Sequence, residues 1–287
     1  MDFPIRSLSH QESRVVLALT ELGRRETTRA EIAALQGGTL NAADMLIAGL
    51  RQKGWLERAA RGTYLIIPPE QGPDVLGTTN LLALASRGVD PYYIGFGTAA
   101  AHYGLTTQHR TVIYVVTLLR RRERIIHDSR VQIVTQSKNK FFGFAPVDVL
   151  DYPVMLSDRE KTTIDCIDHP QLAGGVGEVA AILATASRLF DWNKATEYLE
   201  RMHTGAVARR FGWLADHVKA EMPPDARARV QAVAALSRGT WLGAPKERTV
   251  RAALGYDENW RVFVNVPREE LHGSAGLGQR KRVRKDE

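Results

Sequence analysis

The sequence predicts an α+β protein, and three observations on its 287 residues support this class. Hydrophobic residues make up 44% and charged residues 25%, the ordinary balance of a folded globular chain with room for two or three domains. Segments with apolar residues at helical spacing are interspersed with short β-branched runs. Prolines at 68, 69 and 73 interrupt the chain. We therefore predict one domain over residues 1–70, a second over residues 74–272, and a flexible basic tail over residues 273–287.

The first domain is predicted most clearly from residues 28–68. Thr28 with Glu31 three residues later forms a capping box that begins a short helix. A Gly-Gly pair ends this helix, and Thr39 or Asn41 caps a second one. The apolar residues that we expect on the buried face of the second helix are Leu40, Ala43, Ile47 and Leu50.

A hairpin is predicted directly after these helices. Residues 55–58 and 63–67 have the composition of strands, and the turn between them contains Gly62. A further capping box, Ser9 with Glu12, predicts a helix ahead of the other two. Its expected apolar stripe is Val15, Val16, Leu19 and Leu22. A helix, a tight turn, a second helix and a hairpin are the layout of a winged helix-turn-helix.

A module of this kind places its second helix in the major groove of DNA and its hairpin beside the backbone. The residues that we expect to read base edges are Thr39, Asn41, Ala42 and Met45. Those that we expect to meet phosphates are Arg29, Arg51, Lys53, Arg58 and Arg61. Alternatively, the helices are a plain packing unit and the arginines a solvated surface. Residues 1–70 hold 9 Lys and Arg against 8 Asp and Glu, so charge alone does not decide between these interpretations.

The second domain is predicted to begin as a mixed α/β segment and to end as a mostly helical one. Expected strands cover residues 111–117, 130–135, 141–144 and 147–149. Expected helices cover residues 74–85, 97–103, 192–202, 207–218 and 226–237, with an alanine-rich helix ending at Leu189. A capping box of Ser157 with Glu160 predicts one more helix, which ends near Pro170.

A basic run lies between the first two strands of this domain and consists of Arg120, Arg121, Arg122 and Arg124. Residues 110–140 hold 8 Lys and Arg against 2 Asp and Glu, a local net charge of +6. Three interpretations stay open: a solvated hairpin tip, a second contact to DNA, or a surface for RNA or an acidic protein. We favour the solvated tip.

The whole chain is basic, with a formal charge of +7 and a pI near 9.6, which suits an anionic partner. Its single cysteine, Cys166, excludes an internal disulfide framework. The N-terminus lacks a signal-peptide pattern, and the longest apolar run, residues 112–119, is too short to span a bilayer. We therefore expect a cytoplasmic protein that does not enter membranes.

A few residues invite a chemical interpretation. Asp165, Cys166, Asp168 and His169 lie close together, but they do not match the spacing of a zinc site. His102 has no nucleophile motif beside it. We expect no metal, no cofactor and no enzymatic activity.

Four segments resemble the AbiEi family of antitoxins and autoregulators, which occur in bacterial abortive-infection and toxin–antitoxin operons. They are LERAARGTYLIIP, YYIGFGTAAAHYGLT, the arginine run followed by FFGF, and LSDREKTTIDCIDHPQLAGGVGEV. A weaker match is VARRFGWLADHV. Together the matches cover the chain to about residue 218, and the fourth segment is the most specific.

The resemblance implies a protein of two parts. The winged helix would bind inverted repeats in its own promoter and repress the operon. The C-terminal part would neutralise a nucleotidyltransferase-like toxin encoded next to it, usually without a stable complex. On charge alone, Arg120, Arg121, Arg122 and Arg124 are candidates for antitoxicity. The alternatives are a stand-alone transcription factor with a ligand-sensing or dimerising C-terminal domain, and a DNA-targeted nuclease that uses Asp165 and Asp168.

Overall fold

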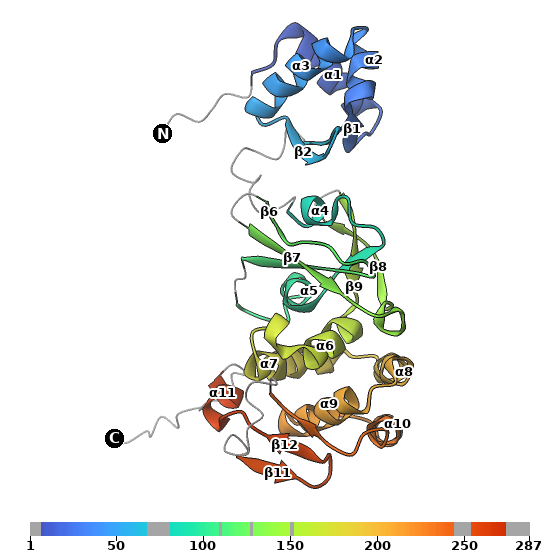
Figure 1. Ribbon diagram of the computed structural model, residues 1–287, viewed down its shortest axis with the longest axis vertical. Coiled ribbons are helices and arrows are strands. Elements are labelled where there is room, and N and C mark those ends of the chain that lie inside the picture. Colours follow the sequence, from blue (N-terminus) through green and yellow to red (C-terminus); the bar gives the residue numbers. More distant parts are fainter. Residues whose placement is uncertain are drawn as a thin grey trace, which may run out of the picture. The chain divides into compact units, whose positions relative to one another are not determined.

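The structure is a computed structural model that describes residues 7–67, 81–108, 111–126, 129–149, 152–243 and 254–273. These residues form a mixed α/β protein, which confirms the α+β class (Figure 1). The chain divides into two compact units, residues 1–90 with 146–154 and residues 91–145 with 155–287. The predicted break at residues 70–74 and the tail residues 274–287 lie outside the described residues. None of the helices in the described ranges has the length and apolar character needed to cross a membrane.

The first unit begins with the predicted helices and hairpin. Its elements are α1 (His10–Glu21), β1 (Glu26–Thr28), α2 (Arg29–Gln36), α3 (Leu40–Gln52), β2 (Leu56–Ala60), β3 (Thr63–Ile66) and α4 (Leu81–Ser86). The capping boxes of Ser9 with Glu12 and Thr28 with Glu31 are both present, as predicted. Thr39 caps α3, because its hydroxyl accepts a hydrogen bond from the Ala42 amide at 3.3 Å.

The core of this unit lies between the three helices α1 to α3 and a small antiparallel sheet. The strand order is β1-β3-β2, and β1 was not predicted. Two predicted core residues are wrong: Leu22 is 63% exposed and Leu40 is 47% exposed. Both lie at helix ends, Leu22 at the C-cap of α1 and Leu40 as the first residue of α3. Leu46, six residues further into α3, is buried instead.

An ion pair fastens α1 to the end of α3. The Lys53 ammonium lies 2.7 Å from a Glu12 carboxylate oxygen, and the Glu12 side chain is only 8% exposed. Burial raises the pKa of Glu12, but hydrogen bonds from Lys53 and Ser9 outweigh it, so that the pKa lies below its ordinary value of 4.5. Glu12 therefore stabilises the fold as a carboxylate.

The second unit is built on a six-stranded sheet with the order β6-β7-β5-β4-β9-β8, of which β8 and β9 lie partly in the first unit. Its strands are β4 (Tyr92–Ile94), β5 (Val112–Thr117), β6 (Arg124–Ile126), β7 (Ser129–Thr135), β8 (Phe144–Val149) and β9 (Tyr152–Ser157). The helices are α5 (Phe96–His102), α6 (Arg159–Asp168), α7 (Val176–Ala186), α8 (Trp192–Met202), α9 (Gly205–His217), α10 (Pro224–Ala234) and α11 (Arg268–Gly273). Short 3-10 turns cover Lys138–Lys140, Pro170–Leu172 and Ser187–Leu189.

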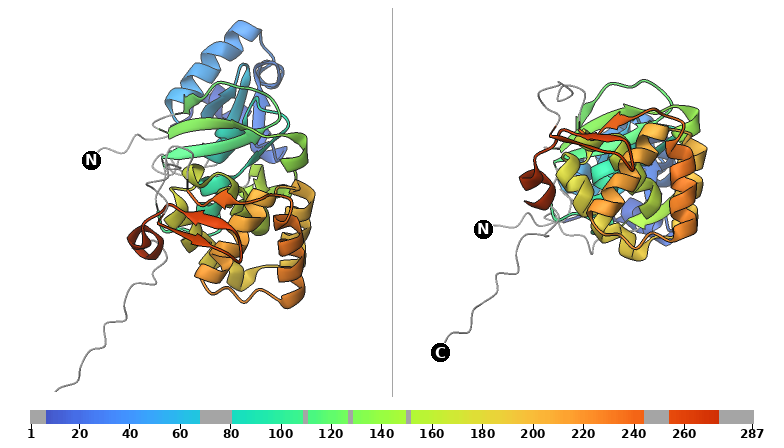
Figure 2. Two further views of the ribbon diagram at one scale, coloured as in Figure 1. Left: turned by 60° about the horizontal axis from the view of Figure 1, so that its bottom comes forward. Right: turned by 90° about the horizontal axis from the view of Figure 1, so that it is seen from below.

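Helices α6 to α10 pack together beside this sheet, which confirms the mostly helical C-terminal part (Figures 1 and 2). A second small sheet, which was not predicted, consists of β10 (Thr240–Trp241), β12 (Val262–Val264) and β11 (Gly255–Asp257) and packs on α9. Trp260 is buried against α9, and its ring lies so close to Gly212 that a Cβ there would be 2.3 Å away. The indole also donates to Asp216 at 2.7 Å.

The predicted cap of α6 is wrong. Asp158, not Ser157, is the N-cap, and its carboxylate accepts from the Lys161 amide at 2.9 Å. Ser157 is the last residue of β9, where its buried hydroxyl lies 2.7 Å from the Thr162 hydroxyl. Ser157 thus belongs to β9, a strand that was not predicted, and the carboxylate that follows it caps the helix.

We predict that replacing Glu12 with Gln destabilises the first unit at neutral pH and matters less in acid. A depressed folded-state pKa means that the stabilisation is complete above the unfolded-state value and is lost as pH falls through the folded-state value. The expected cost at about pH 7 is about 1.5–3 kcal/mol, and it should shrink at about pH 3.5. Urea titrations followed by the methyl NMR signals of Val15 and Leu19 would measure it. A cost that is the same at both pH values would contradict the prediction.

Candidate nucleic-acid interface and buried polar cluster

Helix α3 presents a continuous exposed face on the side opposite the core. We define the α3 face as Asn41, Asp44, Met45, Ala48, Arg51 and Gln52, all of them exposed. These residues recur every three or four positions, the spacing at which side chains lie one above another on a helix. Met45 is 78% exposed, which is unusual for a methionine in a folded domain. Asn41, Met45 and Arg51 therefore lie along one exposed face of α3, while Ala42 is half-buried at the side of this face.

Arg29 is tied to the α3 face by a two-pronged ion pair. It is the first residue of α2, and its Nε and Nη2 atoms lie 2.6 and 2.5 Å from the two carboxylate oxygens of Asp44. Both side chains remain partly exposed, at 38% and 50%. The predicted phosphate contact at Arg29 is thus held in a fixed orientation by a residue that the sequence analysis did not identify.

The hairpin supplies two more of the predicted residues. Arg58 on β2 and Arg61 at the tip are both exposed. The carbonyl of Gly62 accepts a hydrogen bond from the Arg29 amide at 3.1 Å, so the tip is anchored at the start of α2. In the described part of the chain, no ion pair joins Arg51, Arg58 or Arg61, whereas Lys53 is paired with Glu12.

The basic run belongs to the second unit. Arg120, Arg121 and Arg122 are exposed between β5 and β6, and Arg124 is half-buried on β6, the edge strand of the large sheet. Burial lowers the pKa of the Arg124 guanidinium. Glu123 is bound by Arg130 at 2.6 and 3.0 Å, so the acidic residue within the run is already neutralised. Two apolar neighbours are also exposed: Leu119 at 46% and Ile125 at 76%.

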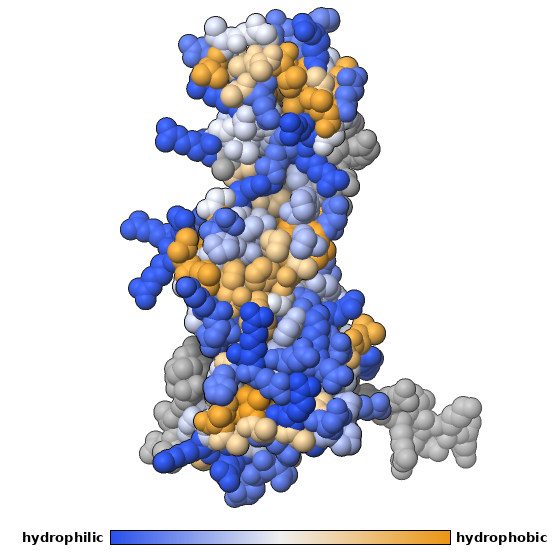
Figure 3. Space-filling view, turned by 90° about the vertical axis from the view of Figure 1, so that its right-hand side faces the viewer, coloured by the Kyte–Doolittle hydropathy of each residue, from blue (hydrophilic) through white to orange (hydrophobic). Residues whose placement is uncertain are grey.

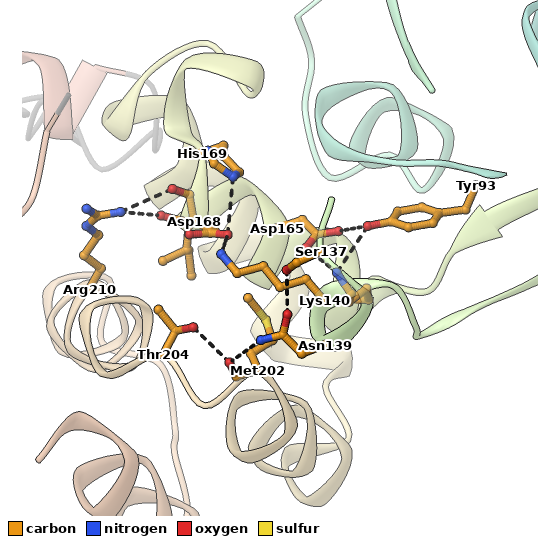
Figure 4. Close-up of polar contacts among 12 residues, drawn as sticks. Tyr93, Ser137, Asn139, Lys140, Asp165, Asp168, His169, Met202, Thr204 and Arg210 are labelled. Atoms are coloured by element: carbon orange, nitrogen blue, oxygen red, sulfur yellow. Dashed lines mark hydrogen bonds and ion pairs between the residues drawn. The ribbon is translucent and has the colours of Figure 1, made fainter. Parts of the chain in front are cut away.

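Asp165, Asp168 and His169, which the sequence places close together, lie in a polar cluster around α6 (Figure 4). Asp165 is completely buried, contacts the ammonium of Lys161, and accepts from the Tyr93 hydroxyl at 2.9 Å. Burial raises the pKa of Asp165, and the charge of Lys161 opposes this shift. Lys161 is equally buried, and its ammonium lies 5.1 Å from the centre of the Phe142 ring. This distance is within the range of a cation–π interaction.

Around the end of α6, Asp168 binds the Lys140 ammonium at 2.5 Å and lies 3.4 Å from His169 (Figure 4). Arg210 on α9 donates to the carbonyls of Ile167 and Asp168 at 3.4 and 3.3 Å, so it satisfies the last carbonyls of α6. Each of the two carboxylates thus has a lysine partner. Within the described ranges, no group of three or more His, Cys, Asp and Glu side chains has an arrangement that could hold a metal ion.

Several residues that matter here were missed by the sequence analysis, among them Asp44, Tyr93, Lys140, Lys161 and Arg210. One local signal existed, because Lys161 and Asp165 stand four residues apart on one helix. The other partners come from segments far apart in the sequence, which no local pattern can join.

We predict that Lys161→Met destabilises the second unit by about 3–5 kcal/mol, because it leaves the Asp165 carboxylate buried without its cation. Adding Asp165→Asn should recover much of this loss, since the amide is neutral and can still accept from Tyr93. Four of the five tryptophans lie in the second unit, so tryptophan fluorescence in urea reports mainly on it. A single variant as stable as the wild type, or a double variant worse than the single, would refute this account.

The comparisons with known proteins bear on the fold alone. No family model matches the chain, and no curated protein matches it. The chain is similar to a solved structure described as the crystal structure of RV2827C protein from Mycobacterium tuberculosis. The TM-score is 0.62 and the sequence identity 17%, over 96% of this chain and 98% of that chain. This arrangement of elements therefore occurs in a solved protein, and the function has to be argued from the geometry of the sites.

Proposed function

We propose that the protein binds double-stranded DNA selectively through its first unit and represses transcription. The observation that carries this proposal is the α3 face, an exposed and mainly polar face with Met45 in it, on the second helix of a helix–turn–helix followed by a hairpin. On this proposal α1 to α3 and β1 to β3 constitute a winged helix, and α3 is its recognition helix.

The order and packing of the elements support this assignment. The turn between α2 and α3 spans residues 37–39, and β2 and β3 pair antiparallel directly after α3. A recognition helix inserts its N-terminal residues into the major groove, which places Asn41 and Met45 near base edges. An asparagine side chain can pair with adenine through its amide oxygen and nitrogen. Arg51, Arg58 and Arg61 are exposed cations suited to phosphates.

For the second unit we propose antitoxicity. The support is the resemblance of its segments to the AbiEi family, which implies repression at inverted repeats and action against a neighbouring nucleotidyltransferase-like toxin. The exposed arginines 120–122 offer a cationic surface for that action. The surface drawn in Figure 3 is mostly hydrophilic, with apolar residues in separate patches.

A second candidate is a stand-alone regulator that senses a ligand. A hollow of about 440 Å³ in the second unit favours it, and its walls include Trp213, His217, Tyr256 and Asp257. The neighbouring gene discriminates between the two proposals. A nucleotidyltransferase-like product encoded there supports the antitoxin, and its absence supports the ligand-sensing regulator.

We predict selective binding to DNA just upstream of the protein's own gene. The double variant Asn41→Ala, Arg51→Ala should lose selectivity over scrambled DNA, since it removes a base contact and a phosphate contact. The matched control is Arg188→Ala, an exposed arginine of the second unit that should leave binding unchanged. Titrations at several salt concentrations would show a slope that falls by about 0.9 for each lost phosphate contact. Equal and weak binding to both DNAs would refute the repressor proposal.

The basic run gives a separate prediction. Replacing Arg120, Arg121, Arg122 and Arg124 with Gln should abolish rescue of cells that express the toxin, if this cationic surface mediates antitoxicity. Repression of a promoter reporter should stay unchanged in the same variant, because the proposed DNA-binding surface lies in the first unit. Unfolding in urea followed by tryptophan fluorescence, with a midpoint like that of the wild type, would show that the second unit is folded. Intact rescue would eliminate the basic run as the antitoxicity surface.

A further inference from the structure

We propose that Arg29 reads a guanine in the major groove and that Asp44 is the positioning residue that aims it. The inference rests on the proposed DNA-binding function and deepens it. It also assigns Arg29 a different role from the phosphate contact that the sequence suggested.

Arg29 keeps three N–H donors that Asp44 does not occupy. A guanidinium has five N–H groups, and Asp44 occupies one on Nε and one on Nη2. The three left over are the two on Nη1 and the outer one on Nη2. Two of these point in parallel from the far edge of the guanidinium plane. Guanine presents two adjacent acceptors, O6 and N7, in the major groove, and an edge with two parallel donors binds them as a pair.

Arg29 is fixed at three points, two of them on or beside its backbone and the third on its side chain. Thr28 and Glu31 form the capping box at the start of α2, and the Arg29 amide donates to Gly62 at 3.1 Å. With the carboxylate of Asp44 as the third point, the side chain is held in one orientation before any DNA binds. Such preorganisation suits base recognition, where the donors have to meet particular atoms.

Stability does not account for this pair. Both side chains are more than a third exposed, and exposed ion pairs contribute little to folding. Affinity for phosphate does not account for it either, because Asp44 places a negative charge on a surface that would face DNA. The exposed cations Arg51, Arg58 and Arg61 have no such acidic partner in the described part of the chain, as phosphate contacts would require.

The test is selection of binding sites from a randomised duplex library by the wild type, Arg29→Ala, Asp44→Asn and Arg51→Ala. The wild type should require a guanine at a particular position, and replacing it with 7-deazaguanine, which lacks N7, should weaken binding about tenfold or more. Arg29→Ala should lose that preference and be insensitive to 7-deazaguanine. Asp44→Asn should lose the preference too, yet bind unrelated DNA more tightly, because a carboxylate has been removed. Arg51→Ala should keep the preference.

Two outcomes would overturn the inference, and they can be told apart. If Arg29→Ala weakens binding to all sequences alike and lowers the salt slope by about one contact, Arg29 is a phosphate contact. If the wild type selects no sequence at all, the proposed DNA-binding function fails and the inference fails with it. Melting temperatures like that of the wild type would show that these exposed substitutions leave the fold intact.

Discussion

The second unit depends on a lysine that is completely removed from water. A buried ammonium is tolerated only when a carboxylate and further polar or aromatic groups surround it. Asp165 supplies the charge, Tyr93 a hydroxyl, and Phe142 the face of a ring. These partners come from β4, from the segment before β8 and from α6, so one ammonium connects the large sheet to the helical layer. Gly143 is part of the same constraint, because it has a φ of +72° and a Cβ there would lie 2.9 Å from the Lys161 Cβ.

The segments that resemble the AbiEi family include the residues that surround or hold the buried Lys161. Phe142 and Gly143 of FFGF pack against Lys161, and the segment from Ser157 to His169 provides Lys161 and Asp165. The RRFGW stretch of α9 donates hydrogen bonds to carbonyls at the end of α6 and at Trp260. The segments that carry the resemblance are thus largely the ones that build the core of the second unit. A resemblance in these segments therefore supports a shared fold and says little about shared binding surfaces. The residues proposed to carry function, the α3 face and the basic run, are mostly exposed, so core packing places little constraint on which residues occupy these positions.

Local rules predicted only part of the local structure. The spacing rule that succeeded at two helices gave the wrong cap for α6, residues 141–143 are not in a strand, and β4, β6 and β9 were not predicted. The capping boxes at Ser9 and Thr28 follow from spacing alone, and α8 was predicted at its observed residues 192–202. The exposure of Asn41 and Met45 follows from helical phase. What sequence could not show is pairing across distance. Asp44 pairs with Arg29, which is 15 residues away in the sequence. Lys53 pairs with Glu12, which lies on another helix. The small sheet of β10 to β12 was missed because strands of two or three residues carry too little periodicity to be recognised.

Pairing also decides what the charge of a segment means. Residues 1–70 are nearly neutral by count, yet their acidic side chains are not spread evenly over the surface. Glu12 and Glu31 are taken up in helix caps, and Asp44 is bound by Arg29. The arginines at 51, 58 and 61 are therefore left as exposed positive charges on α3 and its hairpin. A potential that attracts DNA depends on where charges remain uncompensated, so a near-zero net charge is compatible with a DNA-binding surface. By the same reasoning, the exposed charge of residues 110–140 remains on Arg120, Arg121 and Arg122, with Lys138 as a further exposed cation, because Arg130 is paired with Glu123 and Lys140 with Asp168.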